Sequence, residues 1–398
     1  MKNLLLTSAA LTLAAGTAFA GGHRNVTLGV MLGFTGPAES LAPGMADGAE
    51  LAMAEVSESG VFLGVGHVAT SVRGDSTCID AAAATAVAER MITADEVDGI
   101  VGALCSGATI AALQNVAIAN GMVMISPSAT SPALSTIEDN GLFFRTAPSD
   151  ARQGVVMSDI IMERGFDTVA VTYTNNDYGQ GLADSFAAAF EEAGGTVTLV
   201  AAHEDGRADY SAEVASLAAA GGDLLVVAGY IDQGGPGIIQ AALDTGAFDT
   251  FVLPDGMVGD SITERFGSDI DGSFGQFPGT DSEGAALYFD LAEAAGFDGT
   301  SPFSAEGYDA AALILLAMQA ADSEDPNVYK DFVMDVANAP GEPILPGELG
   351  RALELLAAGE DIDYIGATAV ELIGAGESAG NYREIEVDGG EIGTVGFR

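Results

Sequence analysis

The sequence predicts an α/β protein made of two similar lobes, each built on a mostly parallel sheet, and three observations lead to this expectation. Short apolar runs alternate with amphipathic segments of about 10–15 residues, which is typical of strands joined by helices. The alternation restarts after Asp150, so the chain contains two successive α/β blocks. The length of 398 residues also favours two units, because one domain averages about 150 residues.

The first block is expected to open with a buried strand, Val26–Gly33, followed by a helix, Pro43–Val56, whose apolar residues recur at helical spacing. The alternation then continues as strand Phe62–Thr70, helix Cys78–Thr93, strand Gly99–Leu104, helix Ser106–Ala119, strand Met122–Ile125 and an extended segment Phe143–Thr146.

The second block repeats this order and is followed by a helical tail. Its expected elements are helix Ala151–Arg164, strand Thr168–Thr174, helix Tyr178–Ala193, strand Thr196–Ala201, helix Asp209–Ala220, strand Asp223–Ala228, helix Gly235–Asp244 and strand Thr250–Leu253. The tail is expected to contain helices Ala285–Ala295, Ser304–Ala321, Pro326–Asn338 and Gly347–Ala358, and then strands near Tyr382–Val387 and Glu391–Val395.

Residues 1–20 are typical of a cleaved signal peptide. Lys2 supplies a positive charge, an apolar run follows, and Ala18-Phe19-Ala20 matches a cleavage site that places the mature start at Gly21. The run is shorter than the ~18–20 apolar residues that span a membrane. We therefore expect an exported protein, in which Cys78 and Cys105 can form a disulfide. Two free buried thiols are the alternative.

The charge balance excludes several functions. The chain has 13 Lys and Arg against 58 Asp and Glu, a net charge of −45, so nucleic acid and anionic membranes are not expected partners. The only lysines are Lys2 and Lys330, and no phosphate-binding G-K-[ST] loop occurs.

The sequence contains no complete catalytic or metal-binding motif. Residues 376–380 match G-x-S-x-G, but no histidine follows His203 to act as the base, and Tyr382 begins an expected strand rather than a helix. The three histidines are far apart and lack metal-ligand spacing. We predict no catalytic residue, no metal and no cofactor.

Small hydroxyl residues gather where the strands of the first block end. Ligands of parallel α/β sheets bind beyond the carboxyl ends of the strands. Ser106 opens a helix there, where unpaired N–H groups favour an anion, and Ser128 and Thr130 follow the next strand. Helix capping and turn formation could each explain such a residue alone.

The strand ends of the second block carry two aromatic residues and an acid. Tyr178, Tyr230 and Asp255 each follow a predicted strand. Together they could hold a cationic group attached to an apolar body.

With these segments the chain resembles the leucine/isoleucine/valine-binding protein family, the type I periplasmic solute-binding proteins of branched-chain amino acid ABC transporters. The resemblance covers nearly the whole mature chain and rests on the order of short matches: Thr35-Gly36-Pro37 with residues 47–52, Val101-Gly102 with Cys105-Ser106, residues 125–132, Phe144-Arg145-Thr146 with Asp150 and Gln153-Gly154, Asp177-Tyr178-Gly179 with residues 181–183, and Tyr308-Asp309-Ala310.

The resemblance implies a type I periplasmic binding protein fold, with two Rossmann-like lobes joined by a three-crossover hinge. The N-terminal lobe would comprise residues 21–150 and 279–383, and the C-terminal lobe residues 151–278 and 384–398. It also implies that Cys78 and Cys105 form the family's disulfide.

The resemblance assigns roles to the strand-end residues. Ser106, Ser128 and Thr130 match positions that hold the α-carboxylate and assist with the ammonium. Tyr178 and Tyr230 match aromatics of the opposite lobe, and Asp255 matches the acid that binds the ammonium. Two departures concern the ligand: the family often has Glu at the position of Asp255, and Leu41 stands where some members carry an aromatic.

The expected function is capture of a branched-chain or other aliphatic amino acid in the periplasm and its delivery to a membrane ABC permease. The protein is expected to be a monomer and not an enzyme. One alternative keeps the fold but binds an amide or an aromatic carboxylate. A second is an exported α/β enzyme or a sensor ectodomain.

Overall fold

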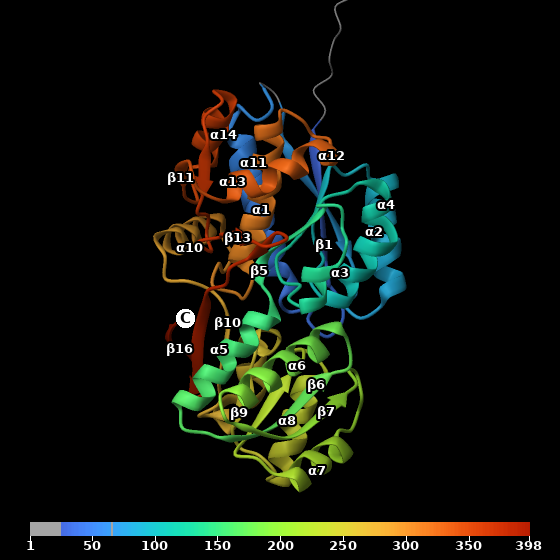
Figure 1. The fold of residues 1–398 in the computed structure, drawn as a ribbon, viewed down its shortest axis with the longest axis vertical. Coiled ribbons are helices and arrows are strands. Elements are labelled where there is room, and N and C mark those ends of the chain that lie inside the picture. The colour runs from blue at the N-terminus through green and yellow to red at the C-terminus, as the bar shows by residue number, and fades with distance from the viewer. Residues whose placement is uncertain (1–24, 65–66) are drawn as a thin grey trace, which may run out of the picture.

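The computed structural model describes residues 25–64 and 67–398, so the predicted signal peptide lies outside the described residues. Two separate seven-stranded sheets form the two halves of the molecule (Figure 1). We call the half built on the first sheet the first lobe and the half built on the second sheet the second lobe. The predicted α/β architecture of two lobes is confirmed.

The first sheet has the strand order β13-β14-β5-β4-β3-β1-β2, in which all neighbouring pairs except β13 and β14 are parallel. Its strands are β1 (Val26–Leu32), β2 (Ala69–Asp75), β3 (Gly99–Gly102), β4 (Met124–Ser126), β5 (Phe143–Pro148), β13 (Leu372–Ile373) and β14 (Glu377–Ser378).

Helices cover the first sheet on both faces. They are α1 (Ala42–Ser59), α2 (Ala81–Thr93), α3 (Ser106–Ala112), which continues through a π-helical turn (Leu113–Ala117) into α4 (Ile118–Asn120), α10 (Glu283–Ala295), α11 (Ser304–Ala321), α12 (Pro326–Tyr329), α13 (Val333–Ala337) and α14 (Leu349–Ala357). A small sheet of β11 (Glu342–Ile344) and β12 (Ile362–Tyr364) lies among the tail helices.

The second sheet has the order β16-β15-β10-β9-β8-β6-β7. Its strands are β6 (Thr168–Thr174), β7 (Thr196–His203), β8 (Leu224–Ala228), β9 (Phe251–Leu253), β10 (Phe274–Pro278), β15 (Tyr382–Asp388) and β16 (Glu391–Phe397). The helices of this half are α5 (Asp150–Glu163), α6 (Asp177–Glu192), α7 (Ser211–Ala220), α8 (Gly234–Thr245) and α9 (Asp260–Phe266). The closing strands form an antiparallel hairpin added to β10.

The chain passes between the two sheets three times: after β5, after β10 and between β14 and β15. Helices α1 and α11, far apart in sequence, pack side by side against the first sheet (Figure 1). Glycine permits this approach, because a Cβ on Gly48 would lie 2.2 Å from the Ser304 carbonyl oxygen and one on Gly307 would lie 2.4 Å from that of Met45. The sheets and these helices form one continuous buried core.

The expected strand Phe62–Thr70 is wrong, because the strand is Ala69–Asp75. Phe62 is buried, but the chain turns after it, with Leu63 and Gly64 at positive φ. The real strand lies at the sheet edge, where Arg73 is exposed and pairs with Asp47 and Glu50, so it lacks an apolar signature.

Two helix predictions are also corrected. The helix expected from Cys78 begins at Ala81, because Thr77 and Cys78 have positive φ and the Asp80 carboxylate caps the backbone N–H groups of residues 82 and 83. The helix expected over Pro326–Asn338 is divided into α12, a short 3₁₀ turn (Lys330–Phe332) and α13. The strand β10 was not predicted.

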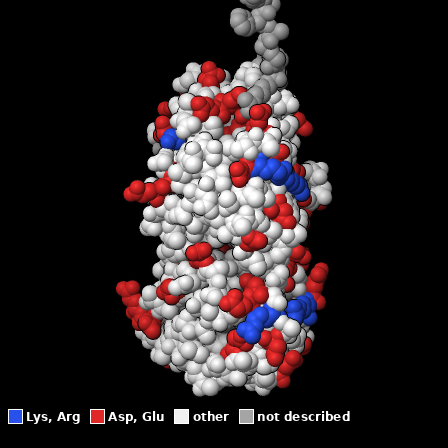
Figure 2. Space-filling model, turned by 90° about the vertical axis from the view of Figure 1, so that its right-hand side faces the viewer, with Lys and Arg blue, Asp and Glu red and all other residues white. Residues whose placement is uncertain are grey.

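The predicted disulfide between Cys78 and Cys105 is confirmed. Among residues 25–64 and 67–398, no helix combines the length and hydropathy needed to cross a membrane. Acidic side chains are scattered over the face in Figure 2, with few basic ones among them.

Candidate functional site

Two of the predicted hydroxyl residues of the first lobe occupy buried strand ends. Ser106 is the first residue of α3, immediately after the disulfide-bonded Cys105, and its Oγ accepts a hydrogen bond from the Ser131 amide at 3.1 Å. The Ser128 hydroxyl donates to the Leu104 carbonyl at 3.0 Å. These bonds fix both hydroxyl groups on one wall of the space between the lobes.

Thr130 lies beside Asp150, at the point where the chain first crosses between the sheets. The Asp150 amide donates to the Thr130 carbonyl at 2.8 Å, and both side chains are buried. Burial raises the pKa of Asp150 well above its usual value, and the negative charge of Asp255 adds to this shift, while Thr130 and Arg145 oppose it. Asp150 is therefore a buried acid directly behind the predicted site.

The opposite wall consists of two stacked tyrosines and an acid. Tyr178 is the second residue of α6, whose N-cap Asn176 accepts hydrogen bonds from the amides of Tyr178 and Gly179. Its ring stacks on Tyr230, which follows β8, at 5.1 Å between centroids. The second lobe therefore presents a flat aromatic surface.

Asp255 follows β9 and is held by Tyr178. The Tyr178 hydroxyl donates to Asp255 Oδ1 at 2.6 Å and accepts from the Gly256 amide at 3.1 Å. Burial raises the pKa of Asp255, and the Tyr178 hydrogen bond acts against that shift. In the described part of the chain no ion pair involves Asp255, so its carboxylate would gain from a cationic partner.

Six of the seven predicted residues line one central cavity between these walls: Leu41, Ser106, Ser128, Tyr178, Tyr230 and Asp255. Thr130 does not line it. The cavity measures about 20 Å³, which is close to the space for one water molecule. An amino acid can enter only when the two walls move apart.

Phe303 also lines the central cavity and was not predicted. It precedes α11 rather than following a strand, and it has a left-handed φ of 63°. No local pattern marks such a residue, because only the packing of α11 against the first sheet brings it to the cavity.

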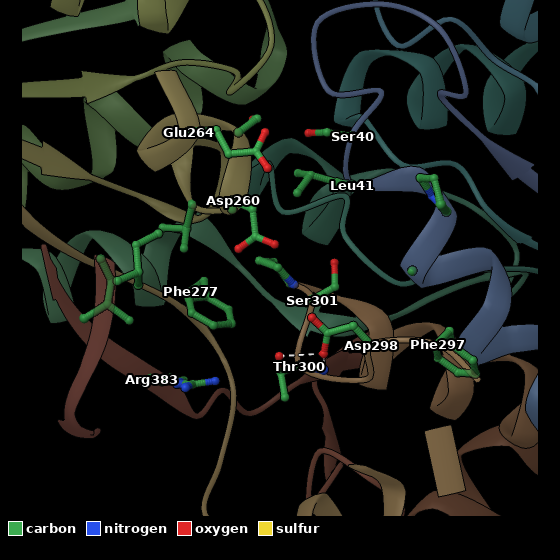
Figure 3. Close-up of a pocket in the computed structure, with 18 of the residues that line it drawn as sticks. Ser40, Leu41, Asp260, Glu264, Phe277, Phe297, Asp298, Thr300, Ser301 and Arg383 are labelled. Carbon is green, nitrogen blue, oxygen red and sulfur yellow. Dashed lines mark hydrogen bonds between the residues drawn. The ribbon is translucent and has the colours of Figure 1, made fainter. Parts of the chain in front are cut away.

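An outer cavity of about 470 Å³ adjoins the central one and shares Leu41 with it. Figure 3 shows acidic side chains from both halves around this space, Asp260 and Glu264 from α9 and Asp298 from the loop before α11, with Arg383 as a basic neighbour. This space carries several charged side chains and is far larger than the central cavity.

Hydrogen bonds join the two lobes beside the central cavity. The Asp232 carboxylate accepts from the Ser40 amide at 2.8 Å, and the Asp232 amide donates to the Pro37 carbonyl at 3.0 Å. Because these bonds cross the space between lobes, they stabilise the closed arrangement described here.

The G-x-S-x-G segment has a structural place in the first lobe. Ser378 lies on β14, and the neighbouring Glu377 forms an ion pair with the buried Arg145. Within the described ranges, no group of three or more His, Cys, Asp or Glu side chains is arranged to hold a metal ion.

The model of the family described as "Periplasmic binding protein" matches residues 25–332. The chain belongs to this family. It is 31% identical over 355 residues to a Leu/Ile/Val-binding protein homolog of Brucella melitensis, an alignment that covers 85% of this chain and 93% of the relative.

Solved structures agree on the fold. A branched-chain amino acid transporter substrate-binding protein of Streptococcus pneumoniae, in complex with isoleucine, matches with a TM-score of 0.77 at 21% identity, over 94% of this chain and 99% of that one. An ABC transporter solute-binding protein of R. palustris, in complex with benzoate, matches with a TM-score of 0.73 at 18% identity, over 94% and 96%. The predicted type I periplasmic binding protein fold is confirmed.

Proposed function

We propose that this chain is a periplasmic substrate-binding protein that captures an aliphatic amino acid, branched-chain in the first instance, and delivers it to an ABC permease. The observation that carries the proposal is the pairing of two unlike walls, one of small hydroxyls and one of an acid with two tyrosines. These walls complement the two ends of a zwitterion. The binding-protein relatives and the predicted signal peptide support the location.

Binding would begin on the first lobe. The α-carboxylate would accept hydrogen bonds from Ser106, Ser128 and the amides at the start of α3. Closure about the three crossovers would then bring Asp255 to the ammonium, and Tyr178 and Tyr230 to the apolar side chain. The charge-assisted bonds would form away from water, where they are stronger.

Closure itself would signal occupancy to the permease. A ligand shifts the open–closed equilibrium only by its differential affinity for the two forms, and Asp255 contributes to that difference because it lies across the cavity from the hydroxyl wall. In this scheme the protein acts as a monomer and has no catalytic residue. In the same scheme the two lobes that close on the ligand meet at residues 150, 278 and 383.

The test is a thermal-shift and calorimetric comparison of leucine, isoleucine and valine with the same carbon skeletons lacking the amine, such as 4-methylpentanoate for leucine. A true ligand at 100 times its Kd should add about 2.7 kcal/mol of stability. Asp255→Asn should weaken leucine binding about 100-fold or more, since it removes a charge-assisted bond. The exposed Asp249→Asn in the same lobe is the matched control and should bind normally.

The alternative ligand class is an aromatic carboxylate, which the benzoate complex of the R. palustris protein favours. Such a ligand needs the hydroxyl wall and the tyrosines but not the acid. Tight binding of benzoate that survives Asp255→Asn, together with no response to any aliphatic amino acid, would overturn the amino acid proposal in favour of this one.

A further inference from the structure

A second cavity, the hinge pocket, lies beside the crossovers between the lobes and has a volume of about 300 Å³. It is bordered by the return segment after β10, by the first turns of α10 and α11, and by Arg383 of β15. The Gly279 amide donates to the Asn381 carbonyl at 3.1 Å, which ties the two neighbouring crossovers together here. The volume is in the range of sites for small molecules.

Most of the wall of the hinge pocket is apolar. Four phenylalanines line it: Phe277, Phe289, Phe303 and Phe397. Phe303 lines both this pocket and the central cavity, and no other residue is common to the two. The hinge pocket is therefore distinct from the central cavity. It adjoins the outer cavity, with which it shares Phe277, Thr300, Ser301 and Arg383.

One acid in this wall has no counter-charge. Glu306, in the first turn of α11, is 3% exposed, and the described part of the chain gives its carboxyl no ion-pair partner. Burial raises the pKa of Glu306 to about 8, and the negative charge of Asp309, one turn further along α11, acts in the same direction. A cation that enters beside this carboxyl favours its ionised form and so opposes the effect of burial.

The basic residue of the pocket is already engaged elsewhere. The Arg383 guanidinium lies 5.6 Å from the centre of the Phe277 ring, and its Nε donates to Thr394 Oγ1 at 2.6 Å. Asp281 lies at the edge of the pocket as a further acid. The charge of the lining therefore favours a cationic ligand over an anionic one.

We propose that the hinge pocket is a second binding site, which takes a small molecule with an apolar, aromatic-sized body and one ammonium group, and that Glu306 supplies the counter-charge. The four phenylalanine side chains would contact the body of this ligand. Binding in the hinge pocket does not require the Asp255 carboxylate, which does not line it.

The test uses the full mature chain with 2-phenylethylamine as the probe and 2-phenylethanol as its neutral counterpart. Calorimetry should be done at about 0.5–1 M salt, because the large excess of acidic residues attracts any amine and salt screens that general effect. We expect the amine to bind at least tenfold more tightly than the alcohol. Glu306→Gln should remove this preference.

A second variant localises the site without altering the buried acid. Ala286 is exposed and lines the pocket, so Ala286→Phe should fill the pocket without disturbing the core, and should abolish binding of both probes. Asp255→Asn should leave amine binding unchanged. Equal affinity for amine and alcohol, a preference that persists in Glu306→Gln, or amine binding that survives Ala286→Phe would each overturn the proposal.

Discussion

The two walls of the central cavity are held in different ways. The wall of the first lobe is anchored covalently, because the Cys78–Cys105 disulfide ends one residue before Ser106. The wall of the second lobe is held by non-covalent contacts, namely the hydrogen bonds from Tyr178 to Asp255 and from Gly256 to Tyr178 and the stacking of Tyr178 on Tyr230. One wall carries neutral hydroxyls in fixed positions, and the other carries a charge whose partner can change.

This difference suggests a division of labour. A preorganised wall lowers the entropic cost of the first contact, because its groups need not be ordered by the ligand. A buried acid that is held by hydrogen bonds, such as the one from the Tyr178 hydroxyl to Asp255, can exchange a partner for an ammonium when the lobes close. We therefore expect damage to the first wall to change stability, and damage to the second to change affinity.

Removal of the disulfide should have the largest effect. In the chain-entropy account, a bridge that closes a loop of this length stabilises by about 3–4 kcal/mol. The double variant Cys78→Ala with Cys105→Ala should lose that amount, measured as a lower urea midpoint at unchanged slope. The affinity of this variant for leucine, measured without urea where the protein is folded, should change much less than its stability.

Reduced wild-type protein is the control for this variant, since it keeps both sulfurs. It should unfold at nearly the same urea concentration as the double variant. If the double variant kept wild-type stability and instead lost affinity, the assignment of a structural role to the first wall would be wrong.

The lobes also differ in their buried titratable groups. In the first lobe, burial raises the pKa of Glu306 to about 8 and that of Asp309 to about 6, so their stabilising contribution is present at low pH and is lost as pH rises through those values. In the second lobe, burial lowers the pKa of His203 to about 4. Burial raises the pKa of Asp205 and Asp255 in the second lobe too, so the acid sensitivity expected there comes from His203.

The expected effect of His203 is about 3 kcal/mol. A histidine with a pKa of about 6.5 unfolded and about 4 folded binds its proton first in the unfolded chain, so stability falls as pH decreases from 6.5 to 4. His203→Gln should remove that part of the acid loss, measured by urea unfolding at pH 7 and pH 4. The Gln can still meet the Thr172 hydroxyl, which lies 2.8 Å from His203 Nδ1.

An imidazole titration by NMR checks the cause independently. His203 should remain neutral down to about pH 4, since it is buried at the end of β7. A titration midpoint near 6.5 in the folded protein, or an unchanged pH dependence in His203→Gln, would contradict this account.

Much of this arrangement could be predicted from the sequence, because the signals are local. Buried parallel strands are continuous apolar runs, and the residues after them gather at one sheet edge, which placed Ser106, Tyr178 and Asp255 around one cavity. The edge strand β2 was misplaced because its exposed face carries polar residues such as Arg73.

Features that depend on packing could not be predicted. Phe303 reaches the cavity only because α11 packs against α1. Thr130 lies one layer behind the cavity, where it contacts Asp150 rather than the cavity space, although its place in the sequence resembles that of Ser128. Residues that follow one strand lie at the same edge of the sheet, but they need not all reach the cavity. Which of them reach it depends on the side chains that pack between them and the cavity.

The smallest predicted effect compares one hydroxyl from each wall. Tyr178→Phe removes the donor to Asp255 and the acceptor of the Gly256 amide, and should weaken leucine binding about tenfold, or about 1.4 kcal/mol. Ser106→Ala removes the acceptor of the Ser131 amide and should cost about 1 kcal/mol of stability, with a change in affinity of about threefold. Calorimetry and urea unfolding of both variants measure the two quantities together.

The decisive quantity in this last comparison is the ratio of the affinity loss to the stability loss. It should be larger for Tyr178→Phe, because its hydroxyl bonds an acid that is expected to change partner on closure, whereas the Ser106 hydroxyl bonds a backbone amide of its own lobe. Tyr230→Phe is the matched control, because it keeps the stacked ring but its hydroxyl is not the donor to Asp255. Equal ratios for Tyr178→Phe and Ser106→Ala would mean that the two walls do not differ in role, since a preorganised wall and an adjustable one cannot respond alike to the loss of a single hydrogen bond.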